Sequence, residues 1–354
     1  MTIKIKKIKL DKSQPVYDLT VEGTHNFYAN GMVVHNCVEI TLFTDLLRTA
    51  VCCLSSLNLE KYDEWSKDEN FIEDIMRFLD NIIQHFIDNA PEEMAKAAFS
   101  AMRERSVGLG VMGFQSLLQS KGIPIESALA KSWNLRIFKH INESANAASR
   151  KLAEERGACP DAAEYDIMER FTNKTAIAPT ASISIIAGNT SPGIEPFPGN
   201  AFTQKTLSGS FLVKNKQLEI VLETHGKNDK RTWSSIITNE GSVQHLNFLD
   251  EYEKDVFKTA FEMDQRWLVE HAADRAEFID QSQSLNLFVP ADISKKELHF
   301  LHYLAWKKGV KSLYYCRSKS LQRAHKVSHS VDRVVIQEEK DYNPYDTDEC
   351  LSCQ

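Results

Sequence analysis

The chain has 354 residues, 42% of them hydrophobic and 26% charged, a composition typical of one large folded domain or two medium ones. Its net charge of −7 provides no basic excess for binding a phosphate backbone, which argues against a nucleic-acid-binding protein. No apolar stretch reaches the roughly 18 residues of a membrane span, so we expect a cytoplasmic protein with neither nucleic-acid nor membrane partners.

The first 36 residues consist of short β-type runs, such as 16–21 and 32–34. Turn-forming residues separate these runs, among them Asn30-Gly31, a pair that favours a two-residue hairpin turn. Periodicity by itself predicts a small β-rich subdomain at the N-terminus.

The run ends in His35-Asn36-Cys37, which has the residue types needed for self-cleavage of the backbone. An Asn side-chain amide can attack its own carbonyl to form a succinimide, a preceding His can polarise that carbonyl, and a following thiol can accept an acyl group. Residues 16–37 as a block resemble the C-terminal motifs of inteins. The resemblance implies that Asn36 cyclises with help from His35, that Cys37 is the first residue after the intein, and that Asp18 and His25 support the junction.

An intein also needs an N-terminal nucleophile and a Thr-x-x-His block, for which residues 1–36 have no room. The segment therefore resembles the C-terminal half of a split intein, a small all-β piece amounting to half of a Hint-type fold. This implies splicing in trans with a separate chain. A natural split and an artificial cut at this point would give the same sequence.

Beyond Cys37, apolar residues at helical spacing predict an amphipathic helix over 69–89 that ends at Asn89-Ala90-Pro91. Composition favours further helices at 91–104, 126–156 and 250–274, whereas 175–178 and 310–315 are typical of buried strands. Interleaved helices and strands predict the α/β class.

Gly108, Gly110 and Gly113 have the spacing of a dinucleotide-binding fingerprint. The preceding residues 91–105 favour a helix rather than a strand, and no acidic residue follows at the end of a second strand. We therefore interpret these glycines as sites of close helix packing or of a tight turn, which leaves an autonomous NAD enzyme with little support.

Several segments in chain order resemble the large (α) subunit of class I ribonucleotide reductase. They are Cys37-Val38-Glu39-Ile40, residues 50–59, 107–114, 178–182, Gly193-Ile194-Glu195-Pro196, 276–286 and Leu313-Tyr314-Tyr315. The resemblance implies that residues 37–335 form the C-terminal part of that family's ten-stranded α/β barrel, followed by a flexible acidic tail at 336–354.

The resemblance also assigns roles to individual residues. Cys37 would carry a thiyl radical, Glu39 would be the general base on the ribose 3′-hydroxyl, and Cys52 would be one half of the reducing dithiol. The other thiol and an active-site Asn would belong to an upstream segment that this chain lacks. The adjacent Tyr314 and Tyr315 would relay the radical, which points to class I.

The substrate is implied to be a ribonucleoside diphosphate, contacted by Cys37 and Glu39. Its diphosphate would bind at Pro179-Thr180-Ala181-Ser182, where a strand-to-helix turn would present backbone N–H groups and hydroxyls. An ordinary Ser/Thr helix cap is the alternative interpretation of these four residues.

The C-terminal Cys350-x-x-Cys353 would be a mobile dithiol that re-reduces the internal disulfide and is itself reduced by thioredoxin or glutaredoxin. A zinc site with His325 and His329 is the competing interpretation. The remaining cysteines, Cys53, Cys159 and Cys316, are interpreted as packing residues.

Taken together, the sequence predicts a precursor that becomes a reductase by splicing to an N-terminal half. That half would carry the other intein piece and the nucleotide-effector sites. No metal or cofactor is expected on this chain, because the radical would come from a metal-containing small (β) subunit, and the assembled α subunits are expected to dimerise. The rival hypothesis is a non-catalytic assembly fragment of the reductase complex.

Overall fold

The structure is a computed structural model that describes residues 26–29, 32–35, 38–51, 53–206 and 209–318. The chain divides into two compact units, Met1–Cys37 and Val38–Gln354. The division falls one residue beyond the segment that resembles an intein.

The described part of the first unit is an antiparallel hairpin of β1 (Asn26–Ala29) and β2 (Met32–His35). Ala29 lies opposite Met32, and the Asn30-Gly31 pair predicted as a turn lies outside the described residues. The other predicted β runs of this unit lie outside the described residues.

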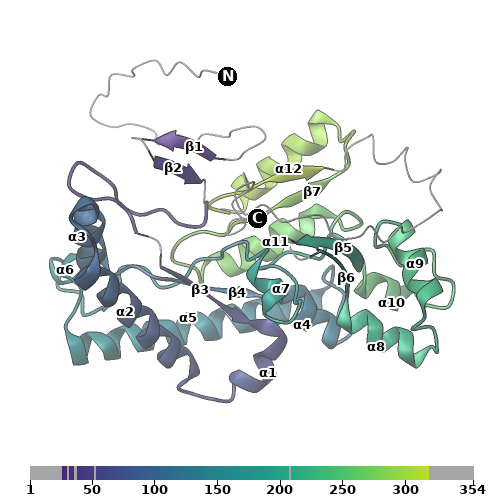
Figure 1. Ribbon diagram of the computed structural model, residues 1–354, viewed down its shortest axis with the longest axis horizontal. Coiled ribbons are helices and arrows are strands. Elements are labelled where there is room, and N and C mark those ends of the chain that lie inside the picture. The colour runs from purple at the N-terminus through teal and green to yellow at the C-terminus, as the bar shows by residue number, and fades with distance from the viewer. Residues whose placement is uncertain (1–25, 30–31, 36–37, 52, 207–208, 319–354) are drawn as a thin grey trace. The chain divides into compact units, whose positions relative to one another are not determined.

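Helices are the most frequent regular elements of the second unit (Figure 1). In chain order they are η1 (Leu59–Lys61), α1 (Tyr62–Trp65), α2 (Phe71–Asn89), η2 (Glu92–Met94), α3 (Ala95–Glu104), α4 (Phe114–Ser120), α5 (Ala128–Arg156), α6 (Pro160–Ala163), α7 (Ile183–Ile186), α8 (Lys216–Thr224), α9 (Lys230–Thr238), α10 (Glu251–Val256), α11 (Gln265–Ala276) and α12 (Lys295–Lys307). Among the described residues, no helix is both long and apolar enough to cross a membrane.

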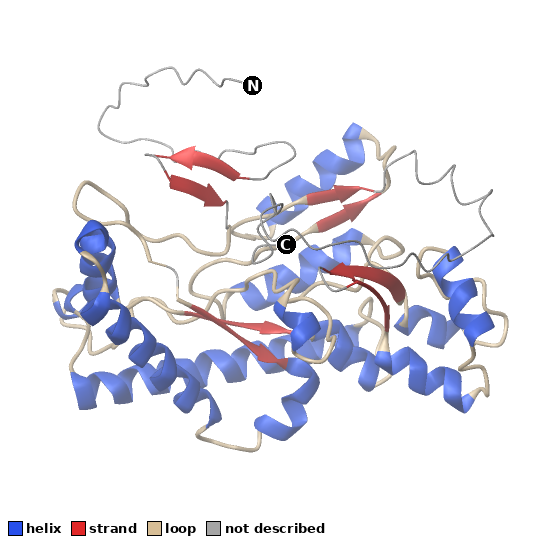
Figure 2. Cartoon of the chain, in the orientation of Figure 1, coloured by secondary structure: helices blue, strands red, loops and turns tan. Residues whose placement is uncertain are grey.

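Parallel strands give this unit its framework (Figure 2). β3 (Leu54–Asn58) pairs in parallel with β4 (Gly108–Met112), and β7 (Leu287–Val289) pairs in parallel with β8 (Cys316–Ser318). Parallel bridges from Leu109 to Thr175 and from Ile177 to Gln283 join the two pairs. The described chain therefore contains five neighbouring parallel segments in sequence order, with helices in the connections, as the predicted α/β class requires.

A separate antiparallel hairpin, β5 (Ala201–Thr206) and β6 (Gly209–Lys214), interrupts the longest of these connections. Helices α8, α9 and α10 gather beside it around a second apolar cluster that includes Leu218, Trp233 and Phe257 (Figure 1). The main core lies between the parallel segments and helices α2, α4, α5 and α11.

Helix prediction succeeded where the apolar period is long and uninterrupted. The predicted helices 69–89, 91–104 and 126–156 correspond to α2, to η2 with α3, and to α5. The single helix predicted over 250–274 is wrong, because residues 257–264 separate α10 from α11. Asp264 begins α11 by accepting a hydrogen bond from the Arg266 N–H.

The two predicted strands also need correction. Residues 175–178 contribute only isolated bridges, and the regular strand near the tyrosines is β8 rather than 310–315. Tyr314 and Tyr315 are half-buried, whereas a buried strand was expected.

The three spaced glycines lie on a strand and at its end, so helix packing does not explain all of them. A Cβ atom at Gly110 would come within 2.4 Å of the Ala176 carbonyl oxygen, which means that β4 approaches the next segment too closely for a side chain. Gly113, with φ +83°, forms the turn into α4, as predicted for a tight turn.

A buried ion cluster holds several helices together around Asp80 of α2, which is 1% exposed. Its carboxylate accepts hydrogen bonds from Arg105 (2.8 Å), Arg170 (2.9 Å) and Arg156 (2.7 Å). Burial by itself would raise the pKa of Asp80, but these arginines outweigh it and lower the pKa.

Replacing Asp80 with alanine is expected to destabilise the protein by about 3–5 kcal/mol, because buried guanidinium groups lose their common counter-charge. Urea unfolding followed by circular dichroism measures the change. Asp88→Ala, at an exposed position of the same helix, is the control and is expected to stay within about 0.5 kcal/mol of the unmodified protein. Equal stabilities for the two variants would contradict the structural role of the cluster.

Candidate active site

Glu39 lies at the centre of the described part of the predicted site. It is 1% exposed, and its carboxylate accepts a hydrogen bond from the Ser284 hydroxyl. The Glu39 carbonyl accepts the Ser282 N–H (2.8 Å), and the Thr41 N–H donates to the Gln281 side chain (2.8 Å). Segment 38–41 is therefore fixed along residues 281–284, and the buried carboxylate has a defined position.

Ser312 connects this segment to the predicted radical relay. Its hydroxyl lies 3.2 Å from the Val38 carbonyl oxygen and 3.0 Å from the Gln283 carbonyl oxygen, and it hydrogen-bonds with the Ser282 hydroxyl. Tyr314 follows Ser312 by two residues. The hydrogen bonds of Ser312 therefore join the segment that contains Glu39 to the segment that contains the tyrosines.

The tyrosine pair forms a contact between two aromatic rings. The ring centroids of Tyr314 and Tyr315 are 3.9 Å apart and their planes are inclined by 39°. The Tyr314 N–H donates to the Leu285 carbonyl (2.8 Å), and the Tyr315 carbonyl accepts the Leu287 N–H (2.9 Å). The Arg317 guanidinium lies 5.7 Å from the centroid of the Tyr315 ring. The pair is thus held against residues 285–287, which directly follow the segment 281–284 that contacts Glu39.

Glu195 and Asn286 also belong to this region, although the sequence assigned neither of them a role. Glu195 is 6% exposed and accepts a hydrogen bond from the Asn286 side-chain amide (2.6 Å). Burial raises the pKa of Glu195 to about 7, against the opposing effects of Asn286 and Arg317. The detectable signal in the sequence was a carboxyl within the otherwise apolar Gly-Ile-Glu-Pro run.

The predicted diphosphate loop forms a turn followed by α7, as expected, but α7 has only four residues. Thr180 adopts a left-handed conformation with φ +54°, and its hydroxyl accepts the Gly193 N–H (2.7 Å). The Ser184 N–H donates to the Thr180 carbonyl. This backbone N–H is therefore already hydrogen-bonded within the turn. The helix-cap alternative is not supported at Ser182, because its side chain makes no capping hydrogen bond to α7.

Several predicted residues lie outside the described residues: Asp18, His25, Asn36, Cys37, Cys52, His325, His329, Cys350 and Cys353. The backbone of His35 ends β2, opposite Asn26. Among the described residues, no group of three or more His, Cys, Asp or Glu side chains could hold a metal ion.

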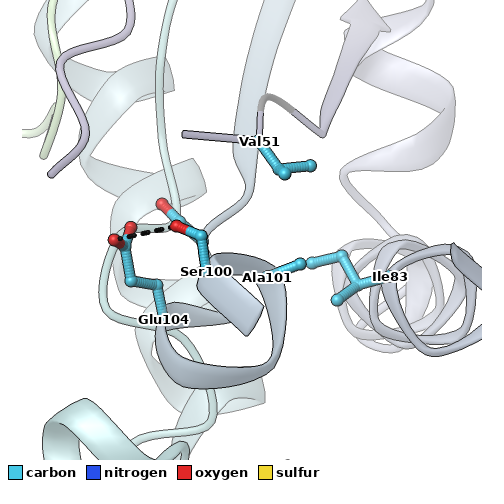
Figure 3. Close-up of a pocket in the computed structure, with 6 residues that line it drawn as sticks. Val51, Ile83, Ser100, Ala101 and Glu104 are labelled. Carbon is cyan, nitrogen blue, oxygen red and sulfur yellow. Dashed lines mark hydrogen bonds between the residues drawn. The ribbon is translucent and has the colours of Figure 1, made fainter. Parts of the chain in front are cut away.

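Two hollows are lined by residues that precede the parallel segments in the chain. A groove of about 360 Å³ is lined by Arg48, Glu104, Asp161 and neighbouring residues. A small cavity lies between Val51, Ile83 and Ala101, where the Ser100 hydroxyl donates to the Glu104 carboxylate (3.4 Å; Figure 3). Thr41 also lines the groove, which therefore adjoins the 38–41 segment, but neither hollow is lined by Glu39, Tyr314 or Tyr315.

Comparison with known proteins adds independent findings. A family model described as "Ribonucleotide reductase, barrel domain" matches residues 16–169 and 162–316. The first match begins inside the segment that resembles an intein. The large subunit of ribonucleoside-diphosphate reductase from Invertebrate iridescent virus 6 is 48% identical over 328 residues, which is 92% of this chain and 34% of that protein.

The corresponding protein of Invertebrate iridescent virus 3 is 46% identical and covers 90% of this chain and 49% of its own length. The class Id ribonucleotide reductase alpha subunit of Actinobacillus ureae has a similar structure, with a TM-score of 0.75 and 38% identity, covering 83% of this chain and 54% of that one. The chain spans about half or less of these relatives. None of them is described as an intein.

The match covers the parallel strands, the buried Glu39 and the tyrosine pair together, and the chain therefore belongs to the ribonucleotide reductase barrel-domain family.

Proposed function

We propose that this chain supplies the radical-cysteine part of a ribonucleoside-diphosphate reductase. The observation that carries the proposal is the buried Glu39 carboxylate, hydrogen-bonded to Ser284 and joined through Ser312 to the segment that bears Tyr314 and Tyr315. A buried base, on a segment linked to a pair of contacting tyrosine rings, supports a reaction that uses a general base and a radical relay.

In the proposed reaction, a thiyl radical on Cys37 abstracts the 3′ hydrogen of the ribose. Glu39 takes the proton of the 3′-hydroxyl and later returns it. Of the two reducing thiols, one protonates the 2′-hydroxyl, which leaves as water, and the other supplies the hydrogen at C2′. Cys52 and a thiol of the missing upstream part supply two electrons and become a disulfide, and the 3′ hydrogen is returned. The Cys350 and Cys353 dithiol then reduces that disulfide by exchange and is regenerated by thioredoxin or glutaredoxin.

The radical would enter from the small subunit through Tyr315 and Tyr314. The 3.9 Å separation of their rings supports transfer between them. The substrate diphosphate would bind at Pro179–Ser182, where Thr180 and Gly193 hold the loop in a left-handed turn. As part of the same proposal, the assembled α subunits form a homodimer, and effector nucleotides bind to the upstream part.

We further propose that residues 1–36 splice this chain in trans to the upstream reductase part. Two observations support this. The β1–β2 hairpin ends at His35, directly before Asn36, and the chain divides into compact units at Cys37. The proposed splicing would place Cys37 at a new peptide bond, in the position where the reductase needs its radical thiol.

Mass spectrometry of the chain mixed with a candidate partner that carries the N-terminal intein piece tests both proposals. We expect loss of residues 1–36, a new peptide bond to Cys37, and ribonucleotide reduction only after ligation. Failure of ligation with an intact partner would contradict the splicing proposal. Ligated protein that assembles with the small subunit but produces no deoxyribonucleotide would instead support the non-catalytic assembly fragment.

A further inference from the structure

A series of short contacts leads from the predicted diphosphate loop to the second tyrosine. At one end, the Gly193 N–H donates to the Thr180 hydroxyl (2.7 Å). A Cβ atom at Gly193 would lie only 3.0 Å from the Ala178 carbonyl oxygen and 3.2 Å from that of Pro179. The loop and residue 193 therefore lie in close backbone contact.

Glu195 follows Gly193 by two residues and faces the strand that holds the tyrosines. Its carboxylate accepts from the Asn286 side-chain N–H (2.6 Å), and the side-chain oxygen of the same Asn286 accepts the Tyr315 N–H (2.9 Å). The side-chain amide of Asn286 thus hydrogen-bonds at both its nitrogen and its oxygen. Asn286 itself is buried, at 1% exposed. A change at Glu195 consequently reaches Tyr315 through one buried side chain.

A carboxyl at this buried position requires an explanation, because an uncharged side chain would avoid its desolvation cost. The hydrogen bonds from the neutral Asn286 and the positive charge of Arg317 on β8 both act to lower the pKa of Glu195. Since burial raises its pKa to about 7, the carboxyl exists in both charge states near neutral pH. A carboxylate accepts a stronger hydrogen bond than a neutral carboxyl, so its ionisation tightens the hold on Asn286.

We propose that Glu195 is a positioning residue that, through Asn286, fixes Tyr315 relative to the loop at 178–182. This inference rests on the proposed reductase function and extends it, because it assigns a role to Glu195, which reaches Tyr315 through Asn286. Its ionisation adjusts how firmly Tyr315 is held, so turnover rises with pH as the carboxyl loses its proton.

The test uses the ligated protein assembled with the small subunit, in three forms: unmodified, Glu195→Gln and Glu195→Ala. Turnover and KM for a ribonucleoside diphosphate are measured between pH 6 and 8.5. Glu195→Gln keeps a side-chain oxygen for Asn286, so it should retain turnover within about threefold at pH 6 but lose the rise with pH. Glu195→Ala leaves the Asn286 N–H unpaired and should lower kcat about tenfold at all pH values.

Glu104→Gln is the matched control. Glu104 is also a buried carboxyl whose pKa is raised by burial, but it ends α3 and its carboxylate contacts Ser100 and Arg48. This variant should keep the unmodified pH profile. The inference is overturned if Glu195→Gln keeps that profile too, or if Glu195→Ala keeps the unmodified kcat. An unmodified enzyme that makes no deoxyribonucleotide would instead overturn the proposed function.

Discussion

Replacing Cys37 with alanine is expected to abolish both the ligation of the two reductase parts and the reduction of ribonucleotides. Splicing needs a nucleophilic side chain at this position to accept the acyl group, and a methyl group provides none. Reduction needs an S–H bond whose sulfur can carry the radical, and alanine lacks that as well. Electrophoresis with mass spectrometry detects the ligated product, and deoxyribonucleotide formation measures reduction.

Glu39→Gln separates these two roles, because the proposed splicing chemistry uses Cys37 but not Glu39, whereas the proposed reduction uses both. This variant should ligate normally and lose about 10²–10⁴ in turnover, the usual contribution of a positioned general base. Full-length ligated product from Cys37→Ala would show that the intein interpretation is wrong. Normal turnover by ligated Glu39→Gln would remove Glu39 from the proposed chemistry.

Replacing Tyr315 with phenylalanine is expected to lower turnover by about 10³-fold or more, a loss of at least about 4 kcal/mol of transition-state stabilisation. Phenylalanine keeps the ring contact with Tyr314 but lacks the phenolic hydroxyl from which a proton and an electron can be removed. The backbone hydrogen bonds of residue 315 to Asn286 and Leu287 are unaffected by the substitution. The loss should therefore appear in kcat and not in KM.

The assay is steady-state turnover of the ligated protein with its small subunit, together with equilibrium binding of the nucleotide. Tyr252→Phe, at an exposed position of α10, removes the same hydroxyl elsewhere and should change neither quantity. Retention of normal turnover by Tyr315→Phe would revive the non-catalytic assembly hypothesis. A large drop in nucleotide affinity would indicate a binding role for this tyrosine rather than a relay role.

The helices could be predicted where local patterns determine them. α2 and α5 have long apolar periods, and their bounds in the structure lie within about two residues of the predicted ones. The break between α10 and α11 was missed because residues 257–264 have a composition compatible with a helix. A tertiary contact holds the segment after α10 in a non-helical conformation. The Ala260 N–H donates to the carbonyl of Phe197, a residue distant in sequence.

The sequence could propose candidate site residues where a motif names them, as for Glu39 and the tyrosine pair. Ser284, Asn286 and Glu195 were missed because each acts through a partner on another segment. Ser284 reaches Glu39 across 245 positions of the chain, and Asn286 reaches Glu195 across 91. A pattern within a short window carries no information about such pairs, and the polar run that contains Ser284 and Asn286 looks like an ordinary loop.

The order of the parallel segments has a consequence for how the protein folds. Leu54 pairs with Gly108, and Ile177 bridges to Gln283, so most of the sheet depends on pairing between distant parts of the chain. Closing such long loops costs entropy before any pairing compensates for it, which slows folding and leaves apolar strands uncovered during synthesis. Chaperone dependence should accordingly be greater for the reductase unit than for the β1–β2 hairpin, whose two strands are joined by two residues.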